Sequence, residues 1–284
     1  RTNSSNYPTT VPNFGTSGGW DIILTKFNAA GTALINSIKI GGTGDDGVNV
    51  RPKYPAGPSN ATETIRRNYG DDARSEVIVD GDGNIYLASC TQSAGALDGF
   101  GAFPTTTGAA QTVRGGSNGP GGRYQDGVVI KTNSTLSNVL FSTLLGGSGD
   151  DAAFVLALHS QNNNIYVAGG TNSTNLPGNF TGSIFPSNQG GADNVDGFIT
   201  ILNNSGTQFI KSTYIGTNVV DIVFGLQFDN FNFRYVMGTT TGNWPVVNAT
   251  FNQLNGKQFI AKLKQDLSGW EYSTRFGTNI SSPN

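Results

Sequence analysis

One strand-like pattern occurs four times in this chain of 284 residues, and it constrains the possible folds more than any other feature. Each copy carries a serine in the same place, and the copies are NSIKIGG (36–42), FSTLLGG (141–147), KSTYIGT (211–217) and YSTRFGT (272–278). The first two continue as GGTGDD (41–46) and GGSGDD (146–151), and the third as a degraded copy at 215–221. A motif that recurs at the same place in each unit indicates a repeat architecture. We therefore interpret the glycine-aspartate stretch as a connection between strands, not as a phosphate or metal site.

Other segments recur in a fixed order around this pattern. One family precedes it: DIILTKFN (21–28), DGVVIKTN (126–133), DGFITILN (196–203) and QFIAKLKQ (258–265). Paired segments follow it: EVIVDGDGNIYLAS (76–89), FVLALHSQNNNIYVAG (154–169) and FGLQFDNFNFRYVMG (224–238). They are rich in β-branched and aromatic residues, with Gly, Asn and Asp at the turns. No helical period is present, so we predict an all-β fold with strands at 21–27, 33–40, 76–80, 85–89, 126–131, 138–145, 154–158, 165–169, 197–202, 208–215, 224–228, 234–238, 258–263 and 269–276.

Taken in chain order, the repeated segments give a consensus that runs D-G-F-V-x-K-L-N, then S-T-Y-L-G-G-S-G-D-D, then A-V-D-x-x-G-N-I-Y-V-x-G, then F-P-T. This combination resembles the bacterial beta-propeller repeat, often abbreviated SBBP, over nearly the whole chain. The resemblance implies a beta-propeller of four-stranded antiparallel blades, a secreted or cell-surface location, and no defined catalytic residues. The chain departs from the pattern in two long insertions and a blurred fourth copy.

The predicted strands make about three and a half blades, which is fewer than the four that the smallest closed propellers have. We expect part of a larger propeller over 1–284, with both ends inside a repeat. Its parts are a half blade with its preceding loop (1–46), an insertion (47–75) and three blades (76–146, 147–217 and 218–284). Missing blades or a neighbouring chain should then cover the inner strand edges at the two ends, because unpaired edges promote aggregation.

Long connections are predicted at one end of the blades, at 2–20, 47–75, 91–125, 170–195 and 239–257. Binding sites usually lie in such loops on a rigid scaffold. Arginine and aromatic side chains in them suit contact with carbohydrate or protein. The candidate binding residues are Arg66, Arg67, Tyr69, Arg114, Arg123, Tyr124 and Trp244. The alternative is that these side chains only solvate the loops. The repeated pairs Tyr7-Pro8, Phe103-Pro104, Leu176-Pro177 and Trp244-Pro245 also indicate that the residue before each proline packs against the blade.

Composition and single residues exclude several classes of function. A net charge of −2 argues against nucleic-acid binding, and no apolar run is long enough to span a membrane. DGDGN at 80–84 resembles half of an EF-hand loop but lacks the later glutamate, so we interpret it as a hairpin turn. His159 is the single histidine and Cys90 the single cysteine, and we interpret both as structural residues. We predict no metal, no cofactor and no catalytic residue.

Asparagine sequons are present at Asn60, Asn133, Asn172 and Asn203, among others, and these four are possible glycosylation sites. Asn133 and Asn203 fall in equivalent turns, where we expect them to be most accessible.

The leading hypothesis is a non-enzymatic extracellular surface or adhesion protein whose propeller is a binding or spacer scaffold. Its partners would be other domains or copies of the same large surface protein, with a carbohydrate or protein ligand. One alternative is a structural module or subunit of an extracellular filament. A second is a propeller enzyme, a hydrolase or lyase, whose site lies outside this segment.

Overall fold

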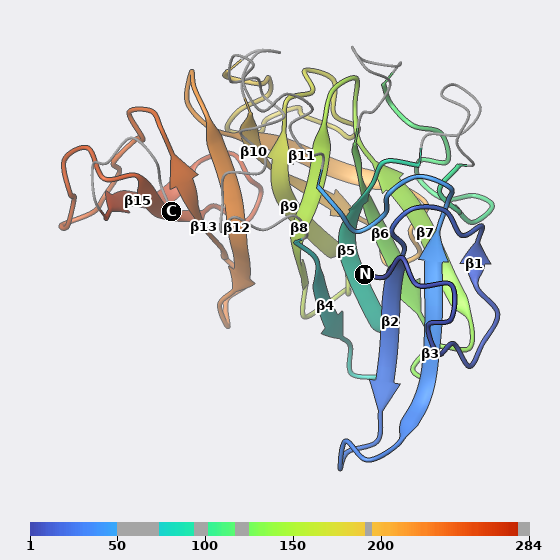
Figure 1. Cartoon of the computed structure of the whole chain (residues 1–284). Helices are drawn as coiled ribbons and strands as arrows, with labels where there is room; N and C mark the ends of the chain where they lie inside the picture. The colour runs from blue at the N-terminus through green and yellow to red at the C-terminus, as the bar shows by residue number, and fades with distance from the viewer. Residues whose placement is uncertain (50–73, 94–101, 117–124, 191–194, 278–284) are drawn as a thin grey trace.

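The computed structural model describes residues 1–49, 74–93, 102–116, 125–190 and 195–277, and in them it places fifteen strands in four sheets (Figure 1). Sheet 1 has the order β1-β3-β2, and each later sheet is an antiparallel meander of four strands. None of the described residues is helical, so the predicted all-β class is confirmed.

The strand bounds agree closely with the predicted ranges. Sheet 1 contains β1 (Phe14–Gly15), β2 (Ile22–Phe27) and β3 (Leu34–Gly41). Sheet 2 contains β4 (Glu76–Val79), β5 (Ile85–Thr91), β6 (Asp126–Thr132) and β7 (Val139–Leu145). Sheet 3 contains β8 (Asp151–Leu158), β9 (Ile165–Thr171), β10 (Asp196–Leu202) and β11 (Phe209–Ile215). Sheet 4 contains β12 (Asp221–Phe228), β13 (Arg234–Thr240), β14 (Gln258–Leu263) and β15 (Trp270–Phe276).

Two details differ from the prediction. The short strand β1 was not expected, and it pairs in parallel with β3 through Phe14 and Ile40. The strands β8 and β12 begin at Asp151 and Asp221, three residues earlier than predicted. The last aspartate of GGSGDD is thus the first residue of a strand, and the interpretation of the stretch as a mere connection is wrong at that position.

Consecutive sheets pack against each other through three apolar clusters. One cluster joins sheets 1 and 2, for example through Ile40 and Val128. The second joins sheets 2 and 3 through Tyr86 and Phe198, and the third joins sheets 3 and 4. Figure 1 shows the sheets following one another from blue to red along the chain. Each unit therefore buries its apolar surface mainly against its neighbours, as in other repeat proteins.

The tight turns between the first two strands of each sheet are equivalent, as predicted. Asp80 accepts hydrogen bonds from the amides of Asp82 and Asn84, and Asp229 accepts them from Phe231 and Phe233. In the same place His159 uses Nδ1 to accept the amide of Gln161 at 3.3 Å. DGDGN is therefore a hairpin turn, and His159 substitutes structurally for the aspartate.

The described residues contain no helix capable of crossing a membrane.

Candidate functional site

The long connections do not all project away from the sheets. In the connection between β5 and β6, Thr106 donates its amide to the carbonyl of Ser142 at 3.0 Å, and Leu144 donates to Gln111 at 3.0 Å. The equivalent connection of sheet 3 bonds to β11, and that of sheet 4 bonds to β15. These segments run beside the last strand of each sheet and occupy hydrogen-bonding groups on its outer edge, which protects that edge.

A serine and a proline fix each of these segments. Ser142, Ser212 and Ser273 have equivalent partners across the sheet, and all three are buried. Their hydroxyls donate to the carbonyls of Pro104, Pro177 and Pro245 at 2.7, 2.7 and 2.8 Å. The serine column predicted from the sequence therefore anchors the connections to the outer strands.

The apolar residue before each of these prolines packs into the core, and this corrects the assignment of Trp244 as a binding residue. Trp244 is 2% exposed and stacks on Phe259 with ring centroids 3.6 Å apart. Its Nε1 donates to Oγ of Ser273 at 2.7 Å. Because ring and N–H are both occupied inside the protein, Trp244 is a core residue.

Arg114 is also not a free residue on a loop surface. Its side chain is 5% exposed, and Nε lies 3.8 Å from Oδ1 of the buried Asp126. The expectation that Arg114 is exposed for ligand binding is therefore wrong. The other candidate binding residues lie outside the described residues: Arg66, Arg67, Tyr69, Arg123 and Tyr124.

Three of the four possible glycosylation sites can be placed. Asn133 and Asn203 lie in equivalent turns, where each side chain is half-buried and its Nδ2 donates to a hydroxyl four residues later. Asn172 accepts the amide of Asp150. The side chain of Asn172 is half-buried as well, so the expected greater accessibility of the first two stays a prediction, as does glycosylation itself. Asn60 lies outside the described residues.

The most repetitive polar arrangement lies between consecutive sheets, where two buried aspartates meet. In two of the pairs, one aspartate begins the third strand of a sheet and the other begins the first strand of the next sheet. In the remaining pair, Asp21 directly precedes β2, and Asp46 forms an isolated bridge with Thr91 of sheet 2. The pairs are Asp21 with Asp46, Asp126 with Asp151, and Asp196 with Asp221. We call these the aspartate junctions 1, 2 and 3.

A glycine at the end of the preceding strand makes room for each pair. A Cβ on Gly41 would press against Oδ1 of Asp21 and lie 2.7 Å from Oδ2 of Asp46. A Cβ on Gly216 would press against Oδ1 of Asp196 and lie 3.2 Å from Oδ2 of Asp221. At junctions 1 and 3 both carboxylates therefore face one small space that glycine leaves open.

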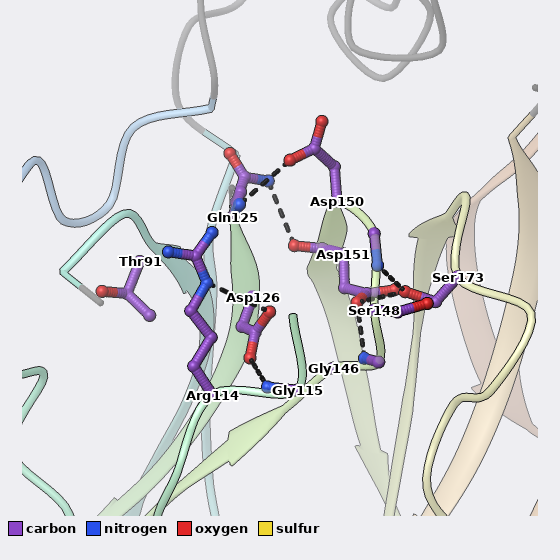
Figure 2. Close-up of polar contacts among 12 residues, drawn as sticks. Thr91, Arg114, Gly115, Gln125, Asp126, Gly146, Ser148, Asp150, Asp151 and Ser173 are labelled. Atoms are coloured by element: carbon purple, nitrogen blue, oxygen red, sulfur yellow. Dashed lines mark hydrogen bonds and ion pairs between the residues drawn. The ribbon is translucent and has the colours of Figure 1, made fainter. Parts of the chain in front are cut away.

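At junctions 1 and 2 the second aspartate is satisfied by a repeated set of donors, whereas at junction 3 none of the described residues donates a hydrogen bond to the buried Oδ1 of Asp221. Asp151 accepts the Oγ of Ser173 at 2.8 Å (Figure 2). It also accepts the amide of Gly147 at 2.7 Å and the hydroxyl of Thr171. Asp46 accepts the same three kinds of donor from Gly42, Ser93 and Thr91. Asp221, in the degraded copy, accepts the amide and hydroxyl of Thr217 at 2.6 and 2.7 Å.

The first aspartate of each junction has fewer donors. Asp126 accepts the amide of Gly115 at 3.1 Å and pairs with Arg114 (Figure 2), and Asp196 accepts the amide of Gln189 at 2.5 Å. Asp21 lies 3.3 Å from Nζ of Lys39. In all three, Oδ1 is buried, and none of the described residues donates a hydrogen bond to it. A carboxylate oxygen in this position is costly when ionised, so a proton is favoured there.

The carboxyl pKa values reflect this environment. Burial raises the pKa of Asp46, Asp126 and Asp196 to about 7 and that of Asp221 to about 6. Burial also raises the pKa of Asp151, and the neighbouring Asp126 raises it further. Each junction therefore holds a proton at pH values where the unfolded chain has lost it.

This linkage predicts a loss of stability as the pH rises. A folded pKa above the unfolded value of 3.8 adds stability that is complete below pH 3.8 and is lost as the pH passes through 6 to 7. We expect the free energy of unfolding to fall by on the order of 2 kcal/mol between pH 5 and pH 8. Thermal unfolding of the wild type and of Asp196→Asn at several pH values measures this change. The free energy of unfolding of the variant should depend less on pH. Equal or greater stability at pH 8 would contradict the junction chemistry.

The junction carboxyl groups occur in pairs, without a third metal-ligating side chain among the described residues. No group of three His, Cys, Asp or Glu side chains that could hold a metal is present among the described residues. Cys90 is fully buried, and burial raises the pKa of its thiol. Both observations agree with the interpretation of Cys90 as a structural residue. The junctions instead join neighbouring sheets through buried hydrogen bonds.

No family model and no curated protein matches the chain. The resemblance to the bacterial propeller repeat therefore depends on the repeated motifs themselves.

Sequence reasoning missed the junctions because it treated each aspartate motif separately. An aspartate begins three of the four segments of the upstream family, and the pattern T-x-S follows two of the inner strands, at 91–93 and 171–173. These signals recur together with GDD, and their co-occurrence could have indicated a shared network.

Proposed function

We propose that the chain is part of a beta-propeller of a secreted or cell-surface protein, and that it is a non-enzymatic scaffold presenting a binding surface at one end of its blades. The observation that carries this proposal is the recurrence of one buried network at successive sheet junctions. A catalytic centre needs a set of side chains in one repeat unit that the other units do not share, whereas a scaffold uses the same contacts in each unit.

The described starts of the two insertions support a common binding end. Asp46, which precedes the insertion 47–75, forms a β-bridge with Thr91, where the connection to β6 begins. The start of β4 lies at the same end of sheet 2, because β4 and β5 are antiparallel. The described ends of these two connections thus lie beside each other, and we propose an acidic carbohydrate as the ligand class.

The test is binding of the purified chain to an array of acidic and neutral polysaccharides. We expect selective binding to acidic members, and a loss of at least about tenfold in affinity for Arg66→Glu/Arg67→Glu, because two phosphate- or carboxylate-binding groups are reversed. Lys211→Glu/Lys264→Glu is the matched control, since it changes the net charge equally, at Lys211 in β11 of sheet 3 and at Lys264 directly after β14 of sheet 4. Its affinity should stay within about twofold.

Three results would count against the proposal. The array could show no binding, the two double variants could behave alike, or the polysaccharide could be cleaved. Cleavage products would favour the enzyme alternative.

A further inference from the structure

The strand β2 differs from its equivalents in having one paired edge only. The strands β6, β10 and β14 are each paired on both sides, and β6 and β10 are buried along their whole length. In contrast, β2 is paired with β3 on one side, and the burial of its residues declines toward Phe27. Within the described residues, the other side of β2 is the edge of sheet 1.

A single bridge shows how a strand fits this edge. Thr2 and Asp21 exchange two backbone hydrogen bonds of 2.8 Å in an antiparallel bridge. Thr171 and Asp196 are paired in the same way at the end of β9. The edge of β2 therefore continues the same antiparallel register that β9 uses along β10.

Phe27 marks the unoccupied part of the edge. It is 56% exposed, whereas its equivalents Leu202 and Leu263 are fully buried. Leu202 is opposite Ile165 of the neighbouring strand, so the sister position shows what a partner strand contributes.

An apolar groove lies beside this edge. It has a volume of about 440 Å³ and is lined by Leu24 and Phe27 of β2, by Val77 and Val79 of β4, and by Ile85 and Leu136, among others. Val77 and Val79 are half exposed. The basic side chain beside the groove, Lys26, donates to the carbonyl of Ser134 at 2.6 Å.

We propose that the free edge of β2 and this groove bind an extended strand with the side-chain pattern of β9, I-Y-V-A-G. The strand would add to sheet 1 antiparallel to β2 and place a branched aliphatic residue opposite Phe27. Main-chain hydrogen bonds supply affinity in this mode, and alternate side chains supply specificity. The occupant is thus a strand of the chain's own repeat type, which goes beyond the proposed ligand at the loop end.

The probe is a labelled peptide with the sequence of residues 161–169, QNNNIYVAG, titrated against the full chain. Two further peptides have the same sequence with N-methyl groups on every second backbone amide. In one of them the odd-numbered amides are methylated, and in the other the even-numbered amides. Since only one set of amides faces β2, methylation of one set should weaken binding by at least about tenfold, and methylation of the other should change it by less than about twofold. Bound peptide should also slow amide exchange in Ile22–Phe27.

A matched pair of exposed phenylalanines tests the groove. Phe27→Lys should weaken peptide binding by at least about tenfold, because it puts a charge where an aliphatic side chain packs. Phe231→Lys changes a 74% exposed residue in a turn of sheet 4 and should leave binding unchanged. Because both side chains are exposed, thermal unfolding should confirm that both variants fold. The proposal fails if the wild type does not bind the peptide, if both methylated peptides bind equally, or if Phe27→Lys binds like the wild type.

Discussion

Replacing Trp244 with alanine is expected to lower the free energy of unfolding by about 3–5 kcal/mol, the usual cost of removing a large buried aromatic side chain. The stack on Phe259 and the hydrogen bond to Ser273 are lost together, and a cavity remains between sheet 4 and its own connection. Denaturant unfolding measures this change.

Trp244→Phe is the matched control for that experiment. It keeps an aromatic ring for the stack but removes the indole N–H, so its cost should be about half as large. If Trp244→Ala unfolds like the wild type but loses ligand binding, Trp244 is a binding residue, and the assignment to the core is wrong.

Asp151→Ala is expected to lower the free energy of unfolding by about 3 kcal/mol at pH 5. The substitution leaves one amide and two hydroxyls buried without their acceptor, and each such group is costly. At pH 8 the loss should be smaller, since the variant also removes a buried carboxyl whose pKa is raised.

Asp82→Ala is the control for this variant. Asp82 lies exposed in the turn before β5, so its substitution removes the same type of side chain without removing a buried acceptor. Its unfolding free energy should change by less than about 0.5 kcal/mol. Equal effects of Asp151→Ala and Asp82→Ala would show that the network contributes no stability.

The sequence predicted the strands well because each one has an alternating or β-branched pattern and is bounded by Gly, Asn or Asp. Repetition strengthened these predictions, since a weak segment such as 224–238 could be aligned with its stronger relatives. The sequence did not predict β1, because a strand of only two residues has no side-chain period.

The polar residues were harder to place because exposure depends on tertiary contacts. Trp244 and Arg114 follow loop-like sequence, and residues of this kind are often exposed for binding. In the structure one packs on Phe259 and the other pairs with Asp126. Neither partner is close in sequence to the residue that it contacts. The repeated pairs of an apolar residue and a proline predicted that Trp244 packs against its blade, but no local pattern predicted the ion pair of Arg114.

The aspartates illustrate the opposite error. GGSGDD was excluded as a unique site because it recurs, but recurrence can also mean that a residue has a repeated structural role. Asp46 and Asp151 have equivalent donors at two different junctions, although more than a hundred residues separate them.

The central claim is that the repeated aspartates join neighbouring sheets and have no separate chemical role. The most direct test measures the thermal unfolding and the ligand binding of Asp46→Ala, Asp151→Ala and Asp221→Ala side by side. The account predicts that all three variants unfold at lower temperature, with the smallest change at Asp221, where the repeat is degraded and its donors come mainly from Thr217. The account would be contradicted if one variant kept wild-type stability and lost binding or another activity, because that junction would then be a functional site.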